Sequence, residues 1–260
     1  VFDDITERKR REANLALLAE IAEDFARLAS ETEIMHSIGA RLAKHLRLDG
    51  FNFSEFNEQF DAATIKYSWN AADVPQLEGT FRHSDFHRTE EFNHAMRAGE
   101  TWVVSDAQSD ERLDGQAAAA IGVGAFIVVP FHRRGKWQGS FTATSRRARE
   151  WTDDEIALIQ EVSNRTFPRL ERARAEAALL ESEARFRSVF FSNMVAMGIW
   201  EKNGGIVEAN DALLGLLGYS RQDMEAGEIK WNLLTPPDYL HLDAQALAEI
   251  AETGRCAPFE

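Results

Sequence analysis

The 260-residue sequence is poor in cysteine and in basic residues, and each shortage excludes a class of protein. Cys256 is its only cysteine, so no disulfide can form within the chain and no cluster of cysteines can hold a metal. Lys and Arg number 29 against 43 Asp and Glu, which gives a net charge of −14. This balance argues against a general affinity for nucleic acid, because that affinity requires clustered cations.

Long apolar runs are also missing. The longest apolar stretch, residues 117–131, contains two glycines and a proline and is too short to span a bilayer. We find neither a membrane segment nor a targeting segment. Together with the single cysteine, this makes a reducing compartment the default, and we expect a cytoplasmic location.

Helix signals are abundant in the first fifth of the sequence. An apolar stripe at 3,4,3,4 spacing predicts a helix over residues 12–29. Its members are Leu15, Leu18, Ala22, Phe25 and Ala29. Ser30 and Glu33 have the spacing of a capping box, which predicts a new helix ending near Gly50. Its expected buried face comprises Ile34, Ile38, Leu42 and Leu46.

Alternating apolar residues predict a sheet in the middle of the sequence. The expected strands are residues 51–57, 63–69, 101–106, 125–131 and 136–144. Gly135 marks the turn between the last two. Short helices are expected over residues 89–99 and 111–123.

A second capping box, Thr152 to Glu155, opens a helical pattern that continues to about Phe190. A second stripe at 3,4,3,4 spacing comprises Leu170, Ala173, Ala177, Leu180 and Ala184. Some 38 helical residues would extend for roughly 57 Å, which favours a connector between domains. Pro168 interrupts the pattern and predicts either a kink or a stop and restart, so we take it as a candidate hinge.

The last part of the sequence has a pattern of strand, Asn203-Gly204 turn, strand and helix. It resembles the front of a PAS domain through Ile206, Asn210, Ala212, Leu217, Gly218 and Tyr219. The resemblance implies that residues 188–260 are the N-terminal part of a PAS domain. Asp4-Ile5-Thr6, after the β-type pair Val1-Phe2, resembles the exit strand of another, so residues 1–11 are expected to be its C-terminal stub.

Residues 30–167 resemble a GAF domain in the order of their expected elements and in two stretches, IGVGAFIVVPFHRRGKWQGSFTAT and REWTDDEIALIQEVSNR. The implied fold class is α+β: a GAF-like antiparallel sheet flanked by helices, with long signalling helices and a truncated PAS fold at the C-terminus. Residues 12–29 and 168–187 are the expected helical linkers.

GAF domains form a pocket between their sheet and loops, and some hold a ligand there. The candidate ligand-binding residues are Phe81, His83, Asp85, Phe86 and Trp102. The alternative is a pocket that is closed or filled by apolar side chains. His83, Asp85 and His87 would share one face of an extended segment, but solvated loop residues are the preferred interpretation and no metal is predicted.

The resemblance also bears on cofactors. Phytochrome-like GAF domains carry a chromophore-contacting motif where this sequence has Ser84-Asp85. The cysteine and histidines that would hold a bilin are absent from the matching positions, so we expect no bilin and predict no other cofactor. A cyclic-nucleotide signature, reactive cysteines inside the domain and common catalytic motifs are missing as well, so no catalytic residue is predicted.

These observations predict a non-catalytic sensory and signal-relay segment of a bacterial two-component sensor histidine kinase. The linker ERARAEAALLESEARFR resembles linkers in such kinases. The same modules regulating a cyclic-di-GMP synthase or phosphodiesterase are the alternative, and a GAF-fold enzyme is a third. The expected partners are a second copy, in a parallel homodimer through the helical linkers, and an output kinase domain outside the sequence.

Overall fold

The computed structural model describes residues 2–72, 79–87, 89–201 and 204–257. The chain divides into two compact units, Val1–Ala177 and Ala178–Glu260, and each is described by itself. Candidate boundaries at residues 11, 29, 167 and 187 stay predictions.

Six strands of the described chain form one antiparallel sheet in the first unit, in the order β3-β2-β1-β6-β5-β4. They are β1 (Gly50–Asn57), β2 (Ala62–Asn70), β3 (Gly79–Arg82), β4 (Trp102–Val104), β5 (Ala125–Arg133) and β6 (Lys136–Ser145). The α+β class and the GAF-like antiparallel sheet are thereby confirmed. Arg134 and Gly135 join β5 to β6 with φ angles of 52° and 75°, the left-handed pair that a tight hairpin turn requires.

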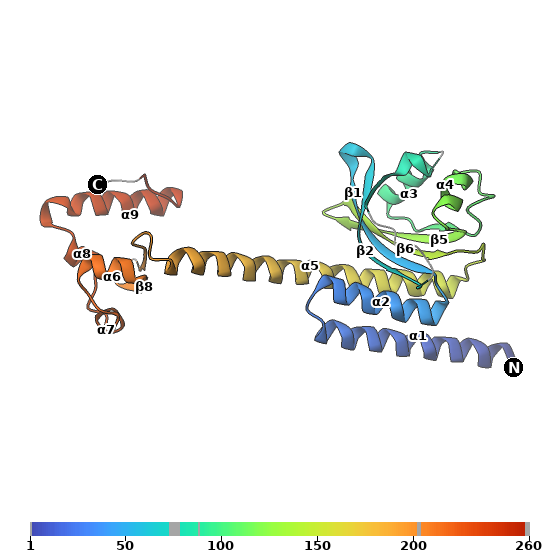
Figure 1. The fold of residues 1–260 in the computed structure, drawn as a ribbon, viewed down its shortest axis with the longest axis horizontal. Coiled ribbons are helices and arrows are strands. Elements are labelled where there is room, and N and C mark those ends of the chain that lie inside the picture. The colour runs from blue at the N-terminus through green and yellow to red at the C-terminus, as the bar shows by residue number, and fades with distance from the viewer. Residues whose placement is uncertain (1, 73–78, 88, 202–203, 258–260) are drawn as a thin grey trace. The chain divides into compact units, whose positions relative to one another are not determined.

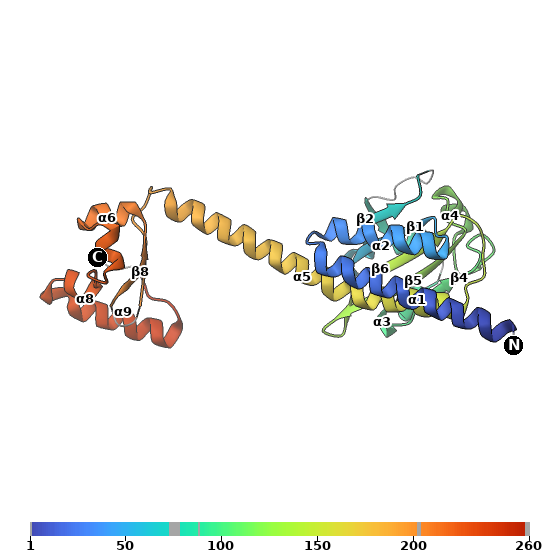
Figure 2. The same ribbon diagram turned by 90° about the horizontal axis from the view of Figure 1, so that it is seen from below.

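Helices cover both faces of this sheet (Figure 1). One face carries α1 (Phe2–Arg27), α2 (Glu31–Leu46) and the first part of α5 (Asp153–Phe191), and Figure 2 shows these three in front of the strands. The other face carries α3 (Glu91–Ala98), α4 (Gly115–Ala120) and the 3-10 turn η2 (His83–Asp85). A second 3-10 turn, η1 (Glu58–Phe60), lies in the connection between β1 and β2. Each face has its own buried apolar cluster, because strand side chains alternate between the faces.

The helix α2 begins as the sequence predicts. The Ser30 hydroxyl accepts the Glu33 amide, and the Glu33 carboxylate accepts the Ser30 amide in return. All four residues of its predicted apolar face are buried: Ile34, Ile38, Leu42 and Leu46. The predicted end near Gly50 is wrong, because Arg47 takes the left-handed conformation (φ 56°) and ends the helix, while Gly50 begins β1.

The helix α1 differs from the prediction at its start and in part of its buried face. Phe2 lies in the helix and not in a strand, while Val1 is outside the described residues. The buried face of α1 contains Leu17 and Ile21, and Leu18 and Phe25 of the predicted stripe pack against the same core, whereas Leu15 is 67% exposed. The next residue on the buried face is polar. Asp24 is 3% exposed and accepts bonds from Arg41 (2.6 Å), Arg27 (3.2 Å) and Ser37.

The helix α5 runs without a break from Asp153 to Phe191, so the stop-and-restart alternative at Pro168 is wrong. Thr152 and Glu155 form the predicted capping box at its start. The second predicted stripe is half buried: Leu170 and Ala173 are 3% exposed, whereas Leu180 is 66% exposed. The predicted helix over residues 111–123 is shorter than expected, since α4 begins only after its cap, Asp114.

The second unit contains a hairpin of β7 (Gly198–Trp200) and β8 (Ile206–Ala209), followed by short helices. These are α6 (Asp211–Leu217), α7 (Arg221–Glu225), α8 (Trp231–Leu234), η3 (Pro237–Tyr239) and α9 (Leu240–Thr253). Gly204 has a φ of 93°, as the predicted turn requires, while Asn203 lies outside the described residues.

Asn210 is the buried polar centre of the second unit, at 0% exposure. Its side-chain NH2 donates to the Phe190 carbonyl (2.8 Å) and the Val195 carbonyl (2.7 Å). Its side-chain oxygen accepts from the Met197 and Leu213 amides, both at 2.9 Å. The amide thereby joins the end of α5, the segment before β7 and the start of α6.

Candidate functional site

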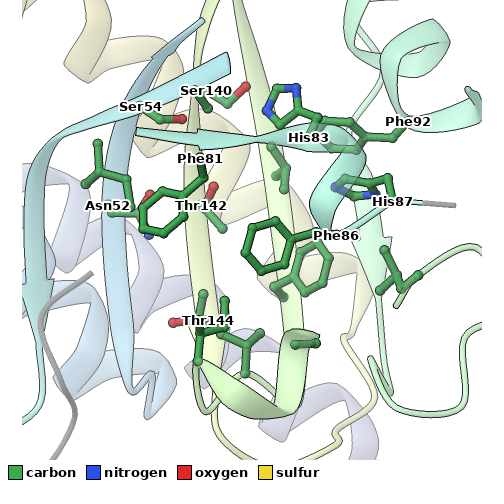
Figure 3. Close-up of a pocket in the computed structure, with 18 residues that line it drawn as sticks. Asn52, Ser54, Phe81, His83, Phe86, His87, Phe92, Ser140, Thr142 and Thr144 are labelled. Atoms are coloured by element: carbon green, nitrogen blue, oxygen red, sulfur yellow. The ribbon is translucent and has the colours of Figure 1, made fainter. Parts of the chain in front are cut away.

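A cavity of about 160 Å³ lies in the first unit, between the sheet and the segment that crosses over it after β3 (Figure 3). Its floor is a row of polar side chains from the two central strands: Asn52 and Ser54 of β1 and Ser140, Thr142 and Thr144 of β6. Its walls are apolar or aromatic and include Phe81, Phe86, Phe92, Phe126 and Val128.

The polar floor follows from strand alternation. Asn52 pairs with Thr142 and Ser54 with Ser140 across the β1–β6 ladder, so both pairs point to the same face. The intervening residues Phe51, Phe53 and Phe141 point to the helix-covered face, where they pack together. One ladder thus supplies an apolar core on one side and a polar cavity floor on the other.

Most of the floor is unsatisfied within the protein. Among the described residues, the side chains of Asn52, Ser54, Thr142 and Thr144 have no hydrogen-bond partner, and Asn52 and Thr144 are only 5% and 8% exposed. Ser140 is different, because its hydroxyl accepts the Trp137 indole N–H at 3.1 Å. Buried polar groups are normally paired, so this row has unused capacity for hydrogen bonds.

Two histidines stand at the edge of the cavity inside an aromatic cluster. The His83 ring stacks on Phe56 and Trp137 at centroid distances of 5.0 and 5.3 Å. The His87 ring stacks on Phe92 at 3.8 Å. Both Nδ1 atoms are buried and have no hydrogen-bond partner among the described residues.

This environment keeps both rings neutral. Burial lowers the pKa of His83 to about 4, although the Asp61 carboxylate opposes the shift. Burial, together with the neighbouring His83 and Arg112, lowers the pKa of His87 to about 3. The cavity lining contains no Lys, Arg, Asp or Glu, so at neutral pH its described wall carries no charge.

The structure brings together three of the five predicted site residues. Phe81, His83 and Phe86 line the cavity, whereas Asp85 and Trp102 do not. Asp85 is exposed because residues 83–85 form a 3-10 turn and not the extended segment that was expected. Trp102 packs behind the wall, with its ring centroid 5.7 Å from that of Phe92 and the Arg112 guanidinium 4.2 Å above it.

Sequence reasoning missed the polar floor. The signal was present, since Asn52 and Ser54 alternate with Phe51 and Phe53, and Thr142 alternates with Phe141. Such alternation is ordinarily assigned to a solvated sheet face. Here α3, α4 and the crossing segment cover that face.

Comparison with known proteins settles the family. A model of the GAF domain matches residues 30–166, more than half of the chain. The chain belongs to the GAF domain family. The hybrid signal transduction protein dokA of Dictyostelium discoideum is 36% identical over 81 residues, which are 31% of this chain and 5% of that protein. The chain therefore corresponds to a small part of that relative.

Solved GAF domains share the fold. The phycoerythrobilin-bound GAF domain of a cyanobacterial phytochrome has a TM-score of 0.53 and 14% identity, covering 63% of this chain and 97% of its own. Free methionine-R-sulfoxide reductase from Neisseria meningitidis, in complex with its substrate, has a TM-score of 0.51 and 16% identity, covering 63% and 91%. The GAF domain of a phosphoenolpyruvate-protein phosphotransferase from Coxiella burnetii has a TM-score of 0.51 and 14% identity, covering 64% and 96%. At these identities the likeness shows the fold alone.

The residues of this GAF domain do not fit a bilin. A cavity of about 160 Å³ compares with a cavity that holds one benzene ring, whereas a bilin has four rings. Residues 30–167 contain no cysteine that could form a thioether bond. The described residues also contain no group of three His, Cys, Asp or Glu side chains placed to hold a metal ion.

One strand connects the cavity to the exit helix α5. Ser54 of β1 lies in the cavity floor, and the next residue, Glu55, points to the opposite face and pairs with Arg174 of α5 at 2.6 Å. Arg174 also pairs with Glu31 of α2 at 2.7 Å, and the Tyr67 hydroxyl of β2 donates to the same Glu31 carboxylate at 2.7 Å. These residues, Glu31, Glu55, Tyr67 and Arg174, are called the α5 clamp below. No described helix is long and apolar enough to cross a membrane.

Proposed function

We propose that this chain is a non-catalytic sensory and relay segment of a two-component sensor histidine kinase. Its GAF domain receives a small-ligand or conformational signal and passes it through α5 to an output domain outside the chain. The proposal rests on one observation: β1 carries the cavity floor on one face and the α5 clamp on the other. If β1 shifts when a ligand fills the cavity, the α5 clamp transmits that shift directly to α5.

The chemistry of the cavity supports a sensory and not a catalytic role. An activated nucleophile needs a base within hydrogen-bond reach, and among the described residues no hydroxyl is bonded to His83 or His87. The lining residues that the structure describes include no carboxylate, and the only cysteine of the sequence lies outside the GAF range. The kinase as output is supported by the resemblance of the linker to those of sensor histidine kinases. The name of the dokA relative, a hybrid signal transduction protein, supports the signalling role.

The test is an output measurement on the full-length protein. Arg174→Gln removes both ion pairs of the α5 clamp, whereas Arg172→Gln removes only an exposed pair with Glu176 on the same helix. We expect Arg174→Gln to change basal autophosphorylation from labelled ATP severalfold, with a phosphohistidine product, and Arg172→Gln to leave it unchanged.

Two results would contradict the proposal in different ways. Equal autophosphorylation in the wild type and both variants would contradict signal transmission through the α5 clamp. Synthesis of a cyclic dinucleotide from GTP, or its hydrolysis, in place of phosphohistidine would assign the output to the alternative class while leaving the sensory role in place.

A further inference from the structure

We infer that the GAF cavity takes an uncharged ligand about the size of one aromatic ring, with hydrogen-bonding groups along one edge. The inference deepens the proposed function and rests on its ligand-sensing part. Three features of the cavity carry it: the charge of its lining, its size and the arrangement of its polar groups.

The lining excludes a charged ligand. An ion transferred into this site would lose its water and find no side chain of opposite charge among the described lining residues, which include no Lys, Arg, Asp or Glu. Arg112 is held by Asp110 at 2.6 Å and lies over Trp102, behind the wall. Phosphate-bearing and carboxylate ligands are therefore disfavoured.

The size and the walls select the body of the ligand. A cavity of about 160 Å³ matches one six-membered ring with a small substituent. Phe81 and Phe86 form one wall, with their ring centroids 6.1 Å apart and their planes at 65°. Aromatic walls of this kind favour the faces and edges of another ring.

The floor selects the polar edge. Asn52 offers both donors and an acceptor, and the hydroxyls of Thr142 and Thr144 can do either. Figure 3 shows these side chains on adjacent strands, opposite the phenyl rings. Asn52 and Thr144 have no hydrogen-bond partner among the described residues, so both side chains are available to pair with a ligand.

Benzamide and benzoate form the decisive pair of probes, because they have almost the same shape and differ in charge. We expect benzamide to bind the 260-residue chain at least about tenfold more tightly than benzoate in calorimetric titration at neutral pH. Cyclohexanecarboxamide, which keeps the amide but loses the flat ring, is expected to bind more weakly than benzamide.

Two variants locate the binding. Thr142→Val removes a floor hydroxyl and should weaken benzamide binding about fivefold. The matched control Thr64→Val changes the same group on β2, where its hydroxyl bonds Thr80 outside the cavity, and should leave binding unchanged. Asn52→Leu removes the floor amide and should weaken benzamide binding as well.

The inference is overturned if benzoate binds as tightly as benzamide, if neither binds at millimolar concentration, or if Thr142→Val and Thr64→Val behave alike. Tight benzoate binding would reject the ligand class and leave the Arg174 result of the full-length protein standing. If benzamide binds but Arg174→Gln leaves autophosphorylation unchanged, the proposed ligand class stands and signal transmission through the α5 clamp is rejected.

Discussion

At the scale of single residues, the two buried histidines couple folding to pH. His83 and His87 exchange water for aromatic rings when the chain folds, and this exchange disfavours their protonated forms. The unfolded chain has no such restriction, so its histidines protonate at the ordinary pKa of 6.5. The two states therefore bind different numbers of protons in mildly acidic solution.

The sign of the resulting pH dependence follows directly. Above pH 6.5 both states are neutral, and the contribution to stability is complete. Between pH 6.5 and about 4, the unfolded chain gains protons that the folded chain excludes, so the free energy of unfolding falls as the pH falls. We expect a loss approaching about 1.4 kcal/mol per pH unit for each histidine, measured by urea unfolding between pH 7 and pH 5.

His87→Phe tests the assignment of this effect. The phenyl ring can keep the stacking on Phe92 but cannot be protonated, so the dependence on pH should shrink by the share of one histidine. His36→Gln, on the exposed face of α2, is the control and should unfold with the wild-type dependence. A slope that His87→Phe leaves unchanged would place the titrating group elsewhere.

At the scale of elements, the sequence predicted best where a local hydrogen bond decides the structure. The starts of α2 and α5 depend on Ser30 with Glu33 and on Thr152 with Glu155, residues three apart, and both were located from the spacing alone. The β5–β6 hairpin depends in the same way on Gly135. Each of these signals is complete within a few residues.

The predictions failed where burial depends on contacts between segments that lie far apart in the sequence. In helix α1, packing against α2 makes Leu17 and Ile21 the most buried apolar residues, beside Leu18 and Phe25 of the predicted stripe. A buried Asp24 could not be expected without Arg41, which lies 17 residues away in the sequence. The polar cavity floor was missed for the same reason, because its cover comes from other parts of the chain.

Pro168 gives the element-scale prediction. It lies inside α5, where it lacks the amide hydrogen that would bond the Asn164 carbonyl. Pro168→Ala restores that bond, so we expect slower hydrogen exchange around residues 164–172. We also expect a free energy of unfolding raised by up to about 3 kcal/mol. In the full-length protein, a hinge at this position further predicts a shifted basal output.

The control for this substitution is Asn164→Ala, which raises helix propensity one turn earlier without adding a backbone bond. If Pro168→Ala changed neither exchange nor output beyond this control, the proline would be a tolerated residue and not a hinge.

At the scale of the whole molecule, the exposed apolar residues of the linker helices predict self-association. Large apolar side chains remain exposed on both linker helices: Leu15 on α1, and Leu179 and Leu180 on α5, each at least 66% exposed. A parallel homodimer through these helices would cover them. The net charge of −14 opposes such association at low salt, so dimers should be favoured as the salt concentration rises.

We therefore expect light scattering to report a dimer at high micromolar concentration and moderate salt, and Leu180→Glu to return the monomer. Ser182→Glu adds the same charge to another face of α5 and should leave the dimer intact. A wild-type chain that stays monomeric under these conditions would rule out the linkers as a self-association surface.

The buried amide of Asn210 also determines which amino acids its position can accept. Its side chain donates two hydrogen bonds and accepts two, and all four partners are backbone groups. Aspartate has no hydrogen to donate, leucine offers neither function, and the longer glutamine would displace its amide from all four groups. We therefore expect a saturation screen at position 210 to recover only asparagine among the folded variants.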